Sequence, residues 1–207
     1  IKPLPHIKKH INDIKLKIFP EKSPLNKFIG IHYRGTDKIE EQNLDEEHPV
    51  HIKYEKIEKI LQDIIQDFKD YDVKIIITTD ENPLIKFLKN SLGNKIINYQ
   101  EANRSKIKTS GLEYKFQLTP SRDKIYDKSV LDPSSRKELV LKEELIKNSI
   151  HMGHKNLSNF KKGLDCLIDA YMLSDCDIIF KSKGNFSNYC TFLNVNPKLK
   201  VIDLQKI

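Results

Sequence analysis

The chain has 207 residues, 38% of them hydrophobic and 31% charged, with a formal net charge of +7. Such a positive charge is typical of proteins that bind nucleic acid or anionic membranes. Here, however, the lysines are spread along every segment, often beside Asp or Glu, and no basic stripe is interleaved with aromatic residues. This distribution argues against nucleic-acid binding.

No apolar run approaches the roughly 20 residues of a membrane span. The three cysteines, Cys166, Cys176 and Cys190, are too few for a four-cysteine zinc site, and their odd number does not suit a disulfide framework. Free thiols favour a reducing compartment such as the cytoplasm. The chain begins with Ile1 rather than Met, so we expect a piece of a longer protein.

The first half of the sequence alternates between two periodicities. Isoleucines at helical spacing predict a helix over 5–18, which we take as a lead-in helix within a linker over 1–20. Short apolar runs predict strands over 27–33, 73–79 and 95–99. A helix is predicted over 52–70, and another begins after Asp80 and runs through Asn90, with the Asp80 carboxylate as its N-cap.

The second half starts with a segment, 100–135, that has no periodicity and is rich in Ser, Thr, Pro and Lys, which predicts an irregular excursion. Helices are predicted over 136–148, 157–173 and 185–193, and strands over 176–180 and 199–204. Strands and helices thus alternate, which predicts an α/β domain with a parallel sheet and right-handed crossovers.

Polar clusters follow three of the predicted strands. They occupy 32–38, 78–81 and 182–187. Ligands of open parallel sheets bind beyond the carboxyl ends of the strands, so we expect these clusters to meet at one rim.

Arg34 is one of only four arginines, and it follows the first predicted strand. A guanidinium group matches phosphate oxygens, so Arg34 suits a diphosphate. Gly35 would let the backbone approach a ligand closely, and His32 could bond a base or a sugar. The turn 182–187 opens a helix and offers free N–H groups to an anion. The alternative is a structural ion pair of Arg34 with Asp37 or Asp80.

Other signatures point to no further chemistry. Neither a phosphate-loop motif nor G-x-G-x-x-G nor G-x-S-x-G is present. The sequence Asp175–Cys176–Asp177 spells D-x-D but precedes a strand, where it suits a turn. The H-x-x-H pairs at 48–51 and 151–154 lack a further ligand at suitable spacing, so we interpret them as surface histidines and predict no metal site.

Three blocks, in order, carry a family resemblance. "IGIHYRGTDK" (29–38) resembles the H-x-R-x-T-D-K signature of the fucosyltransferase superfamily that includes α1,6-fucosyltransferases and protein O-fucosyltransferases. "VKIIITTDENPLIKFLK" (73–89) is similar to the family's strand-T-D-[DE] block. "GLDCLIDAYMLSDCDIIFKSKGNFSNYCTFLN" (163–194) is similar to its helix–strand–turn block. Two positions depart from the pattern: Gly35 replaces a second arginine, and "GNFS" replaces a serine pair.

The resemblance implies the second Rossmann-like half of a GT-B glycosyltransferase, with residues 21–207 forming the domain that binds GDP-fucose. The first domain would precede residue 1. The family usually needs no metal. The resemblance also implies the donor-site residues, which are His32, Arg34, Gly35, Asp37, Lys38, Asp80, Glu81, Asp169, Ser182, Asn185, Ser187 and Asn188.

Within that set the resemblance implies distinct roles. His32 would face guanine or ribose, Arg34 would hold the β-phosphate, and Asp169 would contact guanine. Ser187 and Asn188 would meet phosphate.

The implied function is an inverting transfer of fucose from GDP-fucose to a glycan or protein hydroxyl, with Arg34 as a catalytic residue. Glu40 or Glu41 lies near the position of a family carboxylate that assists the acceptor hydroxyl as a base. The alternative is a nucleotide- or glycan-binding module that kept the fold without turnover. We expect this chain alone to bind nucleotide without turnover.

Overall fold

The computed structural model describes residues 3–19, 23–34, 52–102, 104, 159–182 and 185–207, and all structural statements below concern these residues. The predicted helix over 136–148 and most of the excursion over 100–135 lie outside them. All ten remaining predicted helices and strands are present: two helices with the predicted bounds, and eight helices or strands with bounds shifted by a few residues. The strands are β1 (Asn26–Tyr33), β2 (Asp72–Thr79), β3 (Ile96–Ile97), β4 (Ile178–Lys181) and β5 (Lys200–Asp203).

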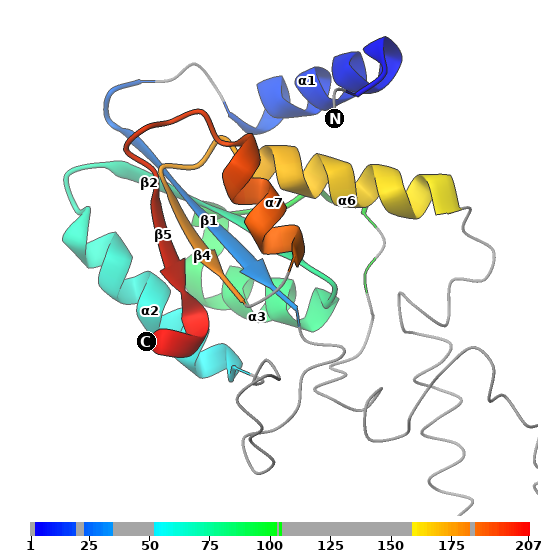
Figure 1. Cartoon of the computed structure of the whole chain (residues 1–207). Helices are drawn as coiled ribbons and strands as arrows, with labels where there is room; N and C mark the ends of the chain where they lie inside the picture. Colours follow the sequence, from blue (N-terminus) through cyan, green and yellow to red (C-terminus); the bar gives the residue numbers. More distant parts are fainter. Residues whose placement is uncertain (1–2, 20–22, 35–51, 103, 105–158, 183–184) are drawn as a thin grey trace, which may run out of the picture.

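The helices are α1 (Pro5–Ile18), α2 (Tyr54–Asp67), α3 (Asn82–Leu92), α6 (Asn159–Leu173) and α7 (Asn185–Leu193), with short 3-10 turns at Gly93–Lys95 and Leu204–Lys206. The last of these turns lies against α2, where Lys56 Nζ donates to the carbonyl of Ile207 over 2.6 Å (Figure 1).

The five strands form one parallel sheet in the order β3-β2-β1-β4-β5. The chain runs outward from β1 to β2 and β3, and the next described strand, β4, pairs with the other side of β1. The strand order therefore reverses between β1 and β4, which is where open α/β sheets form a ligand crevice. The predicted α/β fold with a parallel sheet flanked by helices is confirmed.

Helices cover both faces of this sheet, which explains the nearly continuous apolar runs of the strands. On one face, α2 and α3 pack through Ile57, Leu61 and Leu88 against alternate strand residues such as Ile75 and Ile77. On the other face, α1 and α6 lie side by side (Figure 1). The buried side chains of that second layer are Ile11, Ile14, Phe28, Ile76, Ile168, Met172 and Ile179.

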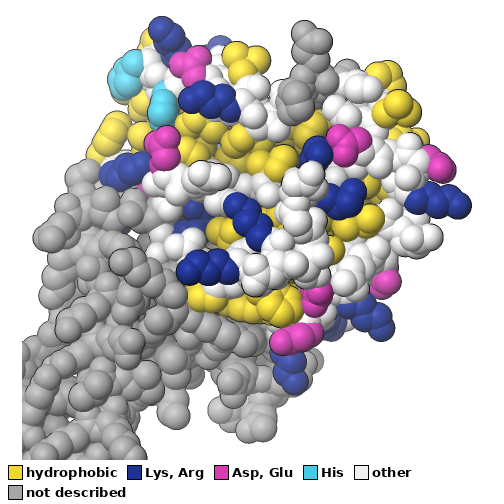
Figure 2. All heavy atoms as spheres, turned by 180° about the vertical axis from the view of Figure 1, so that it is seen from behind, with side chains coloured by type: hydrophobic (Ala, Val, Ile, Leu, Met, Phe, Trp, Pro, Cys, Tyr) yellow, Lys and Arg dark blue, Asp and Glu magenta, His cyan; other side chains and the backbone are white. Residues whose placement is uncertain are grey.

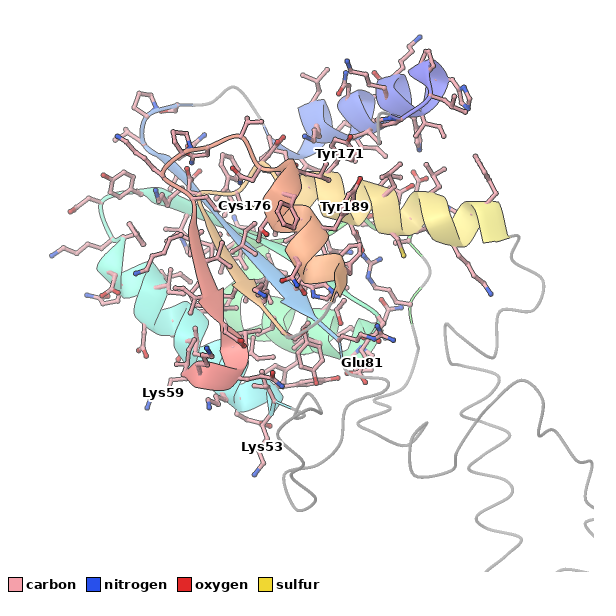
Figure 3. All side chains as sticks on the ribbon, in the orientation of Figure 1. Lys53, Lys59, Glu81, Tyr171, Cys176 and Tyr189 are labelled. Atoms are coloured by element: carbon pink, nitrogen blue, oxygen red, sulfur yellow. The ribbon has the colours of Figure 1, made fainter. Side chains whose placement is uncertain are left out.

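Helix α6 comes close to the centre of the sheet because β1 has a glycine there. A Cβ atom added to Gly30 would lie 2.8 Å from Leu173 Cδ2 and 3.0 Å from Cys176 Sγ. The first distance is shorter than real Cβ contacts and the second lies at their lower limit, so a side chain at this position would force Leu173 and Cys176 to shift. Helix α7 then packs on α6 through Cys190 and Tyr189 (Figure 3).

Two local predictions need correction. Asp80 was predicted to cap α3, but the N-cap residue is Glu81, and its side chain makes no capping hydrogen bond. The Glu81 carboxylate accepts a hydrogen bond from the Tyr54 hydroxyl instead. The strand predicted over 95–99 is only Ile96–Ile97, which lies at the edge of the sheet and pairs solely with β2.

The surface agrees with the scattered charge of the sequence. On the face seen in Figure 2, Lys and Arg side chains lie among acidic and apolar ones and do not gather into a stripe. No helix in the described part of the chain is long and apolar enough to cross a membrane.

Candidate functional site

A pocket of about 290 Å³ opens at the carboxyl end of the sheet. Its lining comes from the ends of β1 and β2, from α6, from the start of α7 and from the segment after β3. The lining residues are His32, Tyr33, Arg34, Thr78, Thr79, Asp80, Ala102, Lys162, Asp165, Cys166, Asp169 and Phe186. Residues of the first two predicted polar clusters thus meet at one rim. From the third cluster, Phe186 lines the pocket.

Arg34 and His32 reach the pocket because β1 carries them to the rim. Arg34 follows the last residue of β1 and is partly exposed. His32 is 9% exposed, and its ring lies 4.8 Å from that of Phe186 at an interplanar angle of 41°. A cation and an imidazole therefore border the same cavity, an arrangement that suits a ligand with an anionic part and a polar neutral part.

A buried hydrogen-bond network supports the residues that follow β2 at the rim. Glu81 is fully buried, and its Oε2 accepts from the Tyr54 hydroxyl over 2.5 Å. The backbone N–H of Glu81 donates to Thr79 Oγ1 over 3.1 Å. Burial and the Glu81 carboxylate raise the pKa of Tyr54, so this phenol stays a donor. Glu81 (Figure 3) therefore supports the rim, while its neighbour Asp80 lines the pocket.

The helix side of the pocket is built around Asp169 and Arg104. Arg104 is 4% exposed, and its Nη2 lies 3.4 Å from both carboxylate oxygens of Asp169. Its Nη1 donates to the carbonyls of Tyr99, at 2.7 Å, and Ala102, at 3.1 Å. One guanidinium group thus fastens the segment after β3 onto α6.

Burial raises the pKa of Asp169 to about 7, Arg104 opposes the shift, and Asp165 adds to it. Asp165 stands one helical turn before Asp169, is 7% exposed and accepts a hydrogen bond from Lys161 over 2.7 Å. The pKa of the Cys166 thiol is raised by partial desolvation and by both carboxylates, while Arg34 lowers it. The charge of Arg34 therefore acts on the same cavity as the acids of α6.

Apart from Phe186, the described side chains of the third predicted cluster do not line the pocket. Ser187 is fully buried, and its hydroxyl contacts His32 Nδ1 at 2.6 Å and donates to the carbonyl of Ser182 over 2.9 Å. Ser182 is also buried. Asn188 is exposed and accepts from Lys181 Nζ over 2.8 Å. Asn185 is the first residue of α7. Ser187 and Asn188, expected to meet phosphate, therefore do not line the described pocket.

Comparison with known proteins finds no matching family model and no matching curated protein. Among solved structures, the chain is similar to the NodZ α1,6-fucosyltransferase co-crystallised with GDP, with 13% identity and a TM-score of 0.44, over 92% of this chain and 42% of the other. A second structure of NodZ α1,6-fucosyltransferase, soaked with GDP-fucose, has 16% identity and a TM-score of 0.44, and the match covers 93% of this chain and 43% of the other. The structure of the fucosyltransferase NodZ from Bradyrhizobium has 14% identity and a TM-score of 0.41, and the match covers 91% of this chain and 42% of the other.

The chain spans about 42% of the length of the solved proteins it matches. Five predicted residues lie outside the described part of the chain, namely Gly35, Asp37, Lys38, Glu40 and Glu41. The H-x-x-H pairs at 48–51 and 151–154 also lie there. Within the described ranges, no group of three or more His, Cys, Asp or Glu side chains could hold a metal ion.

Sequence reasoning missed Arg104, Asp165 and Tyr54 as parts of this site. Arg104 belongs to a segment without periodicity, and its partner Asp169 lies 65 residues further along the chain. Asp165 could have been found, because it stands four residues before Asp169 and so shares its helix face. Tyr54 lies in an amphipathic helix, and nothing in that pattern indicates a hydroxyl aimed at a carboxylate.

Proposed function

We propose that this chain is the donor-binding half of an inverting glycosyltransferase of the fucosyltransferase superfamily and that its pocket binds GDP-fucose. The observation that carries the proposal is the position of Arg34, which borders a cavity at the strand-order reversal together with His32 and the acids of α6. The cavity volume of about 290 Å³ is close to the lower end of small-molecule sites, roughly 300 Å³.

The two sides of the cavity suit the two ends of a nucleoside diphosphate. Arg34 would pair with the pyrophosphate through its planar fork of donors. Asp169 and Asp165 accept hydrogen bonds, which suits the amino and imino groups of guanine and disfavours a pyrimidine or adenine edge. GDP would therefore bind better than UDP or ADP.

In the transfer itself, the acceptor hydroxyl would attack the anomeric carbon from the face opposite GDP. The bond from that carbon to the phosphate oxygen would break, and GDP would leave with the electron pair. Arg34 would stabilise the negative charge that grows on the β-phosphate, the task that a metal ion performs in other transferases. The acceptor proton would pass to Glu40 or Glu41.

Isothermal titration calorimetry with GDP, UDP and ADP tests the donor site. We expect GDP to bind most tightly. Arg34→Ala should lower its affinity by 100-fold or more, as expected when about 3 kcal/mol of charge-assisted bonding is lost. Arg34→Lys should recover part of it, because an ammonium group keeps the charge and loses the fork. Lys59→Ala is the matched control, since Lys59 is an exposed cation on α2 (Figure 3). Absence of nucleotide binding, or a preference for UDP, would overturn the proposal.

A second candidate is a nucleotide- or glycan-binding module without turnover. The burial of Ser187, which the resemblance assigns to phosphate, favours it. Transfer or hydrolysis of GDP-fucose by this chain, alone or within a longer protein, with loss of that activity in Arg34→Lys, would exclude this candidate.

A further inference from the structure

The imidazole of His32 is tied to the β4–α7 junction by a closed set of hydrogen bonds. Its Nδ1 lies 2.6 Å from Ser187 Oγ. The Ser187 hydroxyl donates to the carbonyl of Ser182 over 2.9 Å. The backbone N–H of Ser182 returns to the carbonyl of His32 over 3.1 Å. The set therefore links the side chain and the backbone of one residue through two serines.

The number of protons in this set favours one tautomer of the imidazole. A serine hydroxyl has one proton, and the Ser182 carbonyl can only accept. Because Ser187 gives its proton to that carbonyl, its oxygen must accept from His32, so Nδ1 carries a hydrogen. In the neutral ring Nε2 then has the lone pair.

Burial of the two serines stabilises the Nδ1–H tautomer of His32. Ser187 is fully buried and Ser182 is 3% exposed, so bulk water does not compete for the hydroxyl. The Phe186 ring, 4.8 Å from that of His32, limits rotation of the imidazole. The opposite tautomer would leave Nδ1 and the Ser182 carbonyl sharing a single proton.

We propose that Ser187 is a positioning residue that holds His32 in the Nδ1–H tautomer, so that Nε2 accepts a hydrogen bond from a hydroxyl or amino group of the bound nucleoside. The identity of the ligand rests on the proposed function above, whereas the tautomer does not. A lone pair at Nε2 repels phosphate oxygens. His32 and Arg34 are therefore assigned to different parts of the ligand, the first to a donor group and the second to the anion.

Long-range ¹H–¹⁵N spectra of the histidine-labelled chain test the tautomer directly. The seven histidines are distinguished by His32→Gln, which removes one set of signals. In the wild-type chain above the pKa of the ring, we expect the pyrrole-type shift on Nδ1 and the pyridine-type shift on Nε2. Ser187→Ala should move both shifts toward the mixture seen in free imidazole, and Ser187→Thr should retain the wild-type pattern.

The matched control is Ser174→Ala. Ser174 is also buried, and its hydroxyl donates to the Tyr171 carbonyl over 2.9 Å, but it lies outside the pocket lining. This variant should leave the His32 shifts unchanged. A wild-type ring protonated on Nε2, or a Ser187→Ala ring identical to wild type, would overturn the inference. The wild-type spectrum shows which ring nitrogen of His32 carries the proton even if Ser187→Ala does not fold.

Calorimetry with analogues tests the ligand side. Dideoxy-GDP lacks the ribose hydroxyls, and IDP lacks the 2-amino group of guanine. We expect one of them to bind roughly tenfold more weakly than GDP to wild type and to Ser187→Thr, and this difference to disappear in Ser187→Ala. If GDP binds and neither analogue behaves so, the inference fails while the proposed function stands. If no nucleotide binds, the proposed function fails and the nitrogen shifts alone decide the inference.

Discussion

The pocket has two walls, and different kinds of interaction hold them. The strand wall consists of His32, Tyr33, Arg34, Thr78, Thr79 and Asp80, and the helix wall consists of Lys162, Asp165, Cys166 and Asp169 of α6 with Ala102. Backbone pairing of β1 with β2 and β4 sets the strand wall, and the neutral hydrogen bonds of Ser187 orient His32 in it. The helix wall depends on the ion pair of Arg104 with Asp169.

Neutral contacts therefore fix the geometry of the strand wall, whereas a charged pair fixes that of the helix wall. The neutral contacts of Ser187 and the backbone pairing keep the rim in one geometry without adding charge to it. The pair of Arg104 and Asp169 keeps a carboxylate in a mostly buried position, where its protonation is linked to folding. We therefore expect the helix wall to respond to pH and to the loss of one residue more strongly than the strand wall.

The largest effect should come from Arg104→Met. This change removes the donors to the carbonyls of Tyr99 and Ala102 and the counter-charge of Asp169. Removing one partner of a buried pair costs about 3–5 kcal/mol. Urea unfolding followed by circular dichroism should give that loss of unfolding free energy. The double variant Arg104→Met/Asp169→Leu should recover part of it, and a double variant no more stable than Arg104→Met would contradict the pairing.

Asp169→Asn should remove a pH dependence of stability. Burial raises the pKa of Asp169 from 3.8 to about 7 in the folded chain, so the folded state binds the proton more tightly than the unfolded state. The stabilisation is complete below about pH 4 and is lost as the pH rises to about 7. Relative to Asp169→Asn, the wild type should lose about 4 kcal/mol over that range, measured by urea unfolding at each pH. A constant difference between the two proteins would refute the shifted pKa.

Gly30→Ala should move the helix wall relative to the strand wall. Its methyl group would lie 2.8 Å from Leu173 and 3.0 Å from Cys176, at the C-terminal end of α6 and in the turn that follows it. Overpacking of this kind costs about 1–3 kcal/mol, measurable as a lower melting temperature. Gly163→Ala is the control, because an added Cβ there meets no atom within 4 Å. Equal melting temperatures for the two variants would mean that α6 does not need the glycine.

An effect of the same order as that of Gly30→Ala should come from Tyr54→Phe beneath the strand wall. The change removes one donor from the fully buried Glu81 carboxylate and leaves the ring packing against Tyr33 and Phe87 intact. We expect a loss of about 1–3 kcal/mol in unfolding free energy. Tyr71→Phe, at an exposed tyrosine, should change nothing, and equal effects of the two variants would argue against the buried network.

Local pattern was sufficient for most of the fold. The apolar runs of β1, β2 and β4 and the periodic isoleucines of α1 and α2 are each contained within one segment, because the burial of a strand or a helix face repeats along the chain itself. Placing Arg34 and Asp80 at one rim needed only the rule that parallel strands end on the same side. The two residues do border one pocket.

The sequence by itself determined the order and type of these elements and the rim that its polar residues reach, since both follow from neighbours in the chain. Only the tertiary structure decided which side chains meet: Ser187 with His32 across 155 residues, Arg104 with Asp169 across 65, and Tyr54 with Glu81 across 27. The physical reason is that a hydrogen bond between distant residues depends on how helices settle on the sheet, within a few tenths of an ångström. No local periodicity encodes that distance.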